Sequence, residues 1–218
     1  MANPKVKICG ITNWTDARRA CEAGADFLGF NFYRKSPRYI SPGRAGKIVA
    51  RLPKGVAAVG VFVNESEAKV AEIARAVGLD YVQLHGDETP EVVKGVARRA
   101  RGVRVIKALR VREGFRATEL AKFRGANAFL LDGFDPNARG GTGKTFDWSV
   151  ARKAQRNGRG RRRIFLAGGL TAENAAEASR RVKPFALDVC SGVERAPGKK
   201  DAARVAAFIA AVRNGKKR

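Results

Sequence analysis

Two side chains in this sequence have the chemistry to move protons, and each follows an apolar run typical of a buried strand. Cys9 lies within the run 6–11, and Asp132 directly follows Phe129, Leu130 and Leu131. The chain holds a single histidine, so a thiolate is a serious candidate for the general base. Each residue also has a plainer interpretation. A buried cysteine often behaves as a small hydrophobe, and an aspartate after a strand often caps the next loop.

A nearby cation and partial burial would prepare these groups for acid–base work. Lys7 lies two residues before Cys9, on the same face of a strand, and its charge is expected to promote ionisation of the thiol. Asp132, partly desolvated at a strand end, would have a raised pKa and could donate a proton. The pattern therefore predicts a base and an acid on different strands.

Two further polar side chains follow predicted strands. Arg38 lies in the segment KSPRY, where Pro37 stiffens the loop so that the guanidinium can bind a carboxylate through two hydrogen bonds. Most single arginines are instead surface charges. His85, in the segment QLHG, is as readily a wall residue with satisfied hydrogen bonds as an acid or base.

Glycine-rich segments follow the last three predicted strands. Glycine lets backbone N–H groups approach an anion closely, so adjacent segments of this kind predict a phosphate site, although one glycine pair alone can simply form a tight turn. The first segment is no nucleotide-binding P-loop, because Ala138 stands where that pattern needs a glycine. The candidate phosphate ligands are Gly141, Gly143, Gly168, Gly169, Ser191 and Gly192.

Eight short apolar runs alternate with stretches of helical spacing, at intervals of about 25 residues, close to the size of a βα unit. Helix-start signals occur at Glu65 or Ser66, at Thr89 and at Thr171. This order predicts an α/β fold, a (β/α)8 TIM barrel of the phosphate-binding type, as one domain over residues 1–218, with a doubly wound open sheet as the alternative. The expected strands are 6–11, 27–32, 57–63, 81–84, 103–109, 128–131, 164–167 and 185–189.

Composition places the chain among cytoplasmic globular proteins. Hydrophobic residues make up 44% and charged residues 29%, no apolar run is long enough to span a bilayer, and the N-terminus does not resemble a signal peptide. The three cysteines form no CxxC pair, which favours reduced thiols over a disulfide scaffold or a zinc site.

The net charge is strongly positive. Lys and Arg number 44 against 20 Asp and Glu, giving +24 at pH 7. Such a field attracts small anions, and also nucleic acid without sequence preference. The excess gathers at 98–104, 156–163 and 213–218, where helix ends, loops and the terminus are expected, so we interpret it as solvated surface.

Motifs over almost the whole chain resemble those of the phosphoribosylanthranilate isomerase family of tryptophan biosynthesis. KICGIT, SPRYIS and GGTGKTFDW, in that order, are highly specific to it. The resemblance implies a cofactor-free Amadori rearrangement of N-(5′-phosphoribosyl)anthranilate to 1-(2-carboxyphenylamino)-1-deoxyribulose 5-phosphate. The other matching segments are GADFLGFNFYRKSPRYISP, VGVFVN, VQLHGDE, VIKAL, LLD, AGGLTAEN, PFALDVCSGVE and PGKKD.

The resemblance also implies roles by matching position. Asp132 would be the general acid that protonates the ribose ring oxygen, and Cys9 the general base that takes the C2′ proton. Arg38 would hold the anthranilate carboxylate, and Asp188 would contact the amino or ribose region; His85 is a further substrate-binding candidate. The glycine segments would cradle the phosphate, and no metal or cofactor is implied. Cys190 departs from the family, which often has serine there.

Two alternatives stay open. A related phosphoribosyl-aminosugar isomerase of histidine biosynthesis shares the fold, but most such enzymes use carboxylates or a lysine where this chain has Cys9. A basic nucleic-acid-binding protein is suggested by charge alone, without an aromatic RNA-binding motif, a helix-turn-helix or zinc ligands. The expected partner is a small phosphorylated substrate, with no membrane, and the chain is expected to be a monomer or homodimer.

Overall fold

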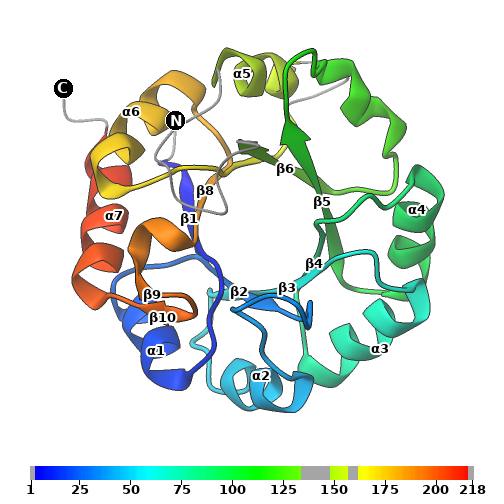
Figure 1. The fold of residues 1–218 in the computed structure, drawn as a ribbon, viewed down its shortest axis with the longest axis horizontal. Helices are drawn as coiled ribbons and strands as arrows, with labels where there is room; N and C mark the ends of the chain where they lie inside the picture. The colour runs from blue at the N-terminus through cyan, green and yellow to red at the C-terminus, as the bar shows by residue number, and fades with distance from the viewer. Residues whose placement is uncertain (1–2, 134–147, 157–161, 216–218) are drawn as a thin grey trace.

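A computed structural model describes residues 3–133, 148–156 and 162–215. Eight parallel strands close into a barrel in chain order, and helices surround it (Figure 1). The predicted (β/α)8 barrel is confirmed. The strands are β1 (Lys5–Ile8), β2 (Phe27–Asn31), β3 (Ala57–Phe62), β4 (Tyr81–Leu84), β5 (Arg104–Val111), β6 (Ala128–Gly133), β7 (Ile164–Leu166) and β8 (Ala186–Val189). The α-helices are α1 (Trp14–Glu22), α2 (Pro42–Val49), α3 (Glu67–Val77), α4 (Pro90–Arg99), α5 (Trp148–Arg156), α6 (Ala172–Val182) and α7 (Ala202–Asn214).

Closure joins the two ends of the chain, because β1 pairs with β8 as well as with β2. Lys7 is opposite Asp188 in this pairing, and Ile8 is opposite Val189. Since side chains alternate between the faces of a strand, register partners share a face, and Lys7 and Asp188 both point inward. Below them the barrel is filled by a separate apolar cluster: Phe27, Val59, Tyr81, Ile106, Ala108, Ala128, Leu130, Phe165, Ala167 and Ala186.

The predicted helix starts are confirmed at their caps. The side chain of Ser66, rather than that of Glu65, accepts a hydrogen bond from the backbone N–H of Lys69 at 3.3 Å. Thr89 accepts from Val92, and the backbone N–H of Thr171 donates to the side chain of Asn174. These bonds satisfy N–H groups that the first turn of a helix leaves unpaired.

The structure corrects two expectations and adds one element that the sequence analysis did not include. The first strand ends at Ile8 rather than at residue 11, because Gly10 adopts φ +78° and the N–H groups of Gly10 and Ile11 both donate to Gly29. Between β5 and β6 only a short 3₁₀-helix forms, η1 (Ala117–Lys122), in place of an α-helix. After β8 the chain forms the three-residue turn η2 (Ser191–Val193). A hairpin that the sequence did not predict follows it, made of β9 (Glu194–Ala196) and β10 (Lys199–Lys200).

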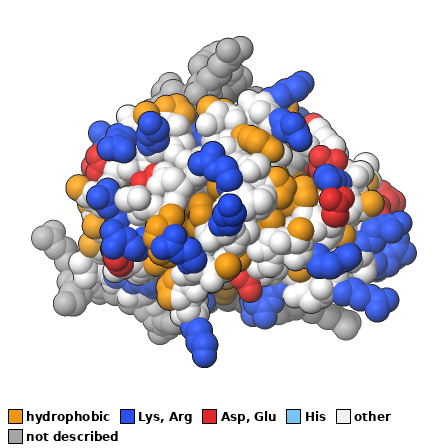
Figure 2. All heavy atoms as spheres, turned by 90° about the horizontal axis from the view of Figure 1, so that it is seen from below, with side chains coloured by type: hydrophobic (Ala, Val, Ile, Leu, Met, Phe, Trp, Pro, Cys, Tyr) orange, Lys and Arg blue, Asp and Glu red, His pale blue; other side chains and the backbone are white. Residues whose placement is uncertain are grey.

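Most described arginines of the basic runs are exposed, but Arg162 and Arg213 are half-buried, and Arg104 opens β5, within the strand predicted over 103–109. Figure 2 shows Lys and Arg side chains spread over one face, among hydrophobic and neutral ones. In the described ranges no helix has the length and apolar composition to cross a bilayer.

Removing the ring of Phe165 from the barrel interior should lower the stability of the fold. Phe165 is fully buried, with its ring centroid 5.3 Å from that of Phe27 and 5.4 Å from that of Phe185. We expect Phe165→Ala to lower the free energy of unfolding by about 3–5 kcal/mol in urea titrations, because it leaves a cavity. Phe115→Ala is the control, since that ring is only half-buried on the β5–η1 connection. Equal losses in the two variants would contradict this account of the core.

Candidate active site

Cys9 lies one residue beyond β1, at the end of the barrel where the carboxyl ends of the strands meet. Its backbone N–H donates to Val189 on β8 at 2.9 Å, so the thiol is held at the seam that closes the barrel. Lys7 lies directly below on the same face, with its side chain completely buried. Its Nζ donates to both carboxylate oxygens of Asp188, at 2.9 Å each.

The Lys7 member of this buried ion pair places a positive charge close to the thiol of Cys9. Burial opposes the ammonium form of Lys7, but the negative charges of Asp188 and Cys9 outweigh it, so the pKa of Lys7 lies above its usual value. Burial also raises the pKa of Asp188, against the attraction of Lys7. The structure thus gives Asp188 a protein partner, in addition to the substrate contact that the sequence suggested.

Three neighbours lower the pKa of Cys9 well below that of an ordinary thiol. The largest effect is a hydrogen bond donated by the Cys190 thiol, which outweighs the opposing effect of burial. The positive charges of Lys7 and Lys200 act in the same direction. The hydrogen bond and burial raise the pKa of Cys190, so that side chain stays a thiol. The expectation that Lys7 favours a thiolate at Cys9 is supported, with Cys190 as the stronger influence.

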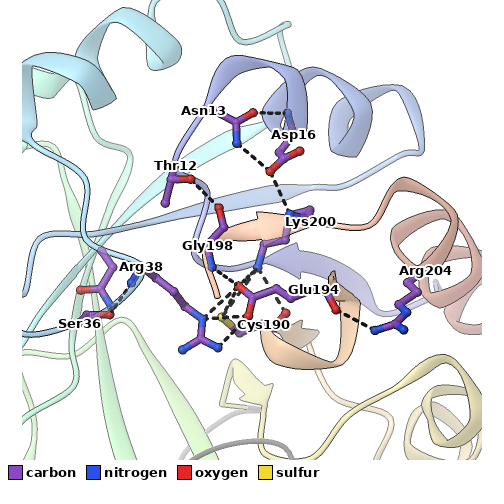
Figure 3. Close-up of polar contacts among 11 residues, drawn as sticks. Thr12, Asn13, Asp16, Ser36, Arg38, Cys190, Glu194, Gly198, Lys200 and Arg204 are labelled. Carbon is purple, nitrogen blue, oxygen red and sulfur yellow. Dashed lines mark hydrogen bonds and ion pairs between the residues drawn. The ribbon is translucent and has the colours of Figure 1, made fainter. Parts of the chain in front are cut away.

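Arg38 holds a carboxylate of the protein itself. Its Nε donates to both oxygens of Glu194, at 3.0 and 3.1 Å, and its Nη2 donates to Oε2 at 2.7 Å (Figure 3). Glu194 also accepts from Lys200 Nζ at 2.9 Å. Burial opposes its charge, but Arg38 and Lys200 prevail and keep its pKa below the usual value. Arg38 and Lys200 therefore share the single negative charge of Glu194, and the three side chains together carry a net positive charge.

The unpredicted hairpin brings Glu194 and Lys200 to this site. Gly198 turns the hairpin with φ +74°, and its N–H donates to Glu194 Oε1 at 3.1 Å (Figure 3). The Nζ of Lys200 lies 3.8 Å from the sulfur of Cys190. The segment PGKKD carries the turn and Lys200, but nothing in it indicates that the chain folds back over Cys190.

The general-acid candidate Asp132 lies near the end of β6, with its side chain 31% exposed. Its Oδ2 is 3.3 Å from Nε2 of His85, which directly follows β4. The other ring nitrogen of His85, Nδ1, is 2.7 Å from Nε2 of Gln83. The sequence indicated His85 and Asp132 separately, but not that they are partners, and it gave no role to Gln83.

Another buried ion pair fixes the loop that carries His85. Nζ of Lys107 donates to Glu88 at 2.7 Å and to the backbone carbonyl of Gly86 at 2.8 Å. The other oxygen of Glu88 accepts from the N–H groups of Asn64 and Gly86. Because Lys107 and Glu88 are almost fully buried, this pair holds the β4 loop rigidly beside Asp132.

The glycine candidates follow β7 and β8. Gly168 and Gly169 directly succeed Ala167 with φ +85° and +62°, a conformation that favours glycine. Ser191 and Gly192 lie in η2, where a Cβ on Gly192 would collide with the carbonyl of Leu170. Gly141 and Gly143 lie outside the described residues. The structure therefore brings the loops after β7 and β8 together at the end of the barrel that carries Cys9.

The ionisation of Cys9 can be measured by alkylation. Because the thiolate is the reacting form and the pKa of Cys9 is lowered, iodoacetamide should label Cys9 at lower pH than Cys21, whose pKa is raised by burial. Lys7→Met should move the Cys9 curve to higher pH. Lys5→Met is the matched control, since it removes a charge from the same strand two residues further from the thiol. Coincident curves for Cys9 and Cys21 would refute the thiolate.

The chain is similar to known proteins over almost its whole length. The family model for N-(5'phosphoribosyl)anthranilate (PRA) isomerase matches residues 6–211. An N-(5'-phosphoribosyl)anthranilate isomerase of Pelobacter propionicus is 51% identical over 94% of this chain and 93% of its own length. An N-(5'-phosphoribosyl)anthranilate isomerase of Pseudomonas putida is 48% identical over 98% of this chain and 99% of its own length. The crystal structure of the Thermotoga maritima isomerase superposes with a TM-score of 0.85 at 44% identity, over 97% and 99% of the two chains. The chain belongs to the N-(5'-phosphoribosyl)anthranilate isomerase family.

Proposed function

We propose that Cys9 and Asp132 are the base and acid of the reaction for which the family is named, the isomerisation of N-(5′-phosphoribosyl)anthranilate in tryptophan biosynthesis. The observation that carries this proposal is a thiol with a lowered pKa after β1 and a carboxyl group on β6, both at the same end of one barrel. One related crystal structure holds reduced 1-(o-carboxyphenylamino)-1-deoxyribulose 5-phosphate, an analogue of the product, and is 41% identical with a TM-score of 0.82.

The two residues divide the chemistry between them. Asp132 gives a proton to the ribose ring oxygen, which opens the sugar to a Schiff base. Cys9 then removes the proton from C2′, and the resulting enolamine tautomerises to the ketone. The net change moves hydrogen from C2′ to C1′ without an external oxidant or reductant. A thiolate can act as the base of the second step, because in its ionised form it can accept the C2′ proton.

Charge and hydrogen bonding fit the two anionic ends of this substrate. The Nε–Nη2 edge of Arg38 is occupied by Glu194, so its Nη1 is left to bind the anthranilate carboxylate. Lys200 neutralises Glu194, so that Arg38 keeps an uncompensated positive charge. Backbone N–H groups of Gly168, Gly169, Ser191 and Gly192, together with Gly141 and Gly143, would bind the phosphate.

The setting of the enzyme is inferred from the same features. The free cysteines Cys9, Cys21 and Cys190 favour a reducing, cytoplasmic location, and the chain acts as one domain, as a monomer or homodimer. The basic surface gathers small anions, and nucleic acid is not a required partner.

Loss of either proton-transfer group should slow turnover with little effect on binding. We expect Cys9→Ser and Asp132→Asn each to lower kcat at least about 100-fold while KM stays nearly constant, because general acid–base catalysis contributes on that scale. The loss of phosphoribosylanthranilate fluorescence measures both constants. Cys21→Ser on α1 is the control and should keep normal activity. Near-normal turnover in either site variant would rule out the assignment.

Loss of the carboxylate site should instead weaken binding. Arg38→Met should raise KM about 10- to 100-fold with a smaller change in kcat, since a charged hydrogen bond contributes about 1.5–3 kcal/mol. Glu194→Gln should also raise KM, because it frees Arg38 from its bidentate partner. Arg44→Met, which removes an exposed arginine hydrogen-bonded to the carbonyl of Thr12, is the control. An unchanged KM for Arg38→Met would remove Arg38 from the binding site.

A further inference from the structure

One feature of the site has no place in the two-residue mechanism: a row of three polar side chains, Gln83, His85 and Asp132, that starts in the barrel interior. Gln83 points inward from β4 and is 1% exposed. Its Nε2 lies 2.7 Å from Nδ1 of His85, and Nε2 of His85 lies 3.3 Å from Oδ2 of Asp132. Among the described residues, the Oε1 of Gln83 has no hydrogen-bond partner.

The orientation of the Gln83 amide decides where the imidazole carries its proton. If the amide N–H donates to Nδ1, the neutral ring carries its proton on Nε2 and donates it to Asp132. In the reversed orientation, two buried amide hydrogens would lack acceptors, and the bare Nε2 of a neutral ring would face the carboxylate. The first orientation leaves the Oε1 acceptor and one amide hydrogen without a partner among the described residues, and it is favoured because it places a donor opposite Asp132.

We propose that Gln83 is a positioning residue for the general acid: its amide fixes the neutral His85 ring with the proton on Nε2, and that N–H holds Oδ2 of Asp132. The inference about the ring concerns the folded protein alone, whereas the consequence for catalysis rests on the proposed function of Asp132. Neither Gln83 nor His85 needs to exchange a proton with the substrate.

The arrangement selects one oxygen of Asp132 for the reaction. With the Nε2–H of His85 directed at Oδ2, 3.3 Å away, the proton that Asp132 donates would reside on Oδ1. A Cβ on Gly168 would lie 2.3 Å from the backbone nitrogen of Gly133 and 2.9 Å from Oδ1, so the glycine leaves room both for the β6 backbone and for that oxygen. Gly168 thus has a role beside Asp132 that is separate from binding phosphate.

Two features make this row rigid enough to hold one geometry. The backbone N–H of His85 donates to Phe62 on β3 at 2.8 Å, which fixes the base of the imidazole. The loop beyond it is held by the buried pair of Lys107 and Glu88. The row is therefore held by a neighbouring strand and by a buried ion pair.

The single histidine of this chain makes the ring tautomer directly measurable. In ¹⁵N-labelled protein at alkaline pH, where the ring is neutral, we expect the NMR signals of His85 to show a protonated Nε2 and an unprotonated Nδ1. Gln83→Met removes the donor and should give a mixture of tautomers. Gln83→Glu replaces the donor with a carboxylate acceptor and should shift the proton to Nδ1. Gln155→Met is the matched control, because it removes another buried glutamine, on α5, that donates to a backbone carbonyl.

Kinetics test the consequence for Asp132. Gln83→Met should lower kcat about tenfold, a factor typical of one lost hydrogen bond, with KM changed less than about twofold. His85→Gln, which retains an N–H donor, should keep more activity than His85→Leu. Gln155→Met should match the wild-type protein.

The outcomes separate this inference from the proposed function. If the NMR signals show that the wild-type His85 ring is protonated on Nδ1, the inference is overturned. This measurement needs no variant, so it decides the question even if a Gln83 variant fails to fold. Unchanged NMR signals in both Gln83 variants, or an unchanged kcat in Gln83→Met, overturn it as well. A wild-type protein that does not isomerise phosphoribosylanthranilate would instead overturn the proposed function, and the tautomer measurement would still stand.

Discussion

The ion pair between Lys7 and Asp188 is the interaction on which the rest of the site depends. It joins the first and last strands, so it lies at the one seam where the chain must close on itself. Two charges taken out of water are tolerated only when they satisfy one another, and losing one partner of such a pair typically costs about 3–5 kcal/mol. The same ammonium lies below Cys9 and stabilises its thiolate. Closure of the barrel and preparation of the base therefore share one interaction.

Buried charge recurs around this end of the barrel, always in partnered form. Glu194 is shared by Arg38 and Lys200, and Glu88 is held by Lys107. Such pairs add little net stability compared with apolar packing, but they fix geometry because each carboxylate accepts several hydrogen bonds. Here they orient a guanidinium, a thiol and an imidazole.

The proposed base, Cys9, follows β1 and the proposed acid, Asp132, lies on β6, and this separation suits a reaction with two separate proton transfers. The neighbourhood of Cys9 is cationic and favours the ionised thiol. Asp132 has instead an imidazole, partial exposure and the open backbone of Gly168 as neighbours. A barrel allows this separation because each strand end is surrounded by its own loops. The interior below, filled by Phe27, Phe165 and other apolar side chains, serves only to hold the strands.

The sequence by itself determined the periodic features of this protein. Apolar runs at regular spacing indicated all eight strands, and the caps at Ser66, Thr89 and Thr171 marked helix starts, because these signals act between residues close in the chain. Its motifs also indicated Cys9, Asp132 and Arg38. Only the tertiary structure decided which groups became partners: Lys7 with Asp188, Arg38 with Glu194, and His85 with Asp132. Those contacts join residues that lie 181, 156 and 47 positions apart in the chain. No local pattern encodes them, since barrel closure and the turn at Gly198 bring them together.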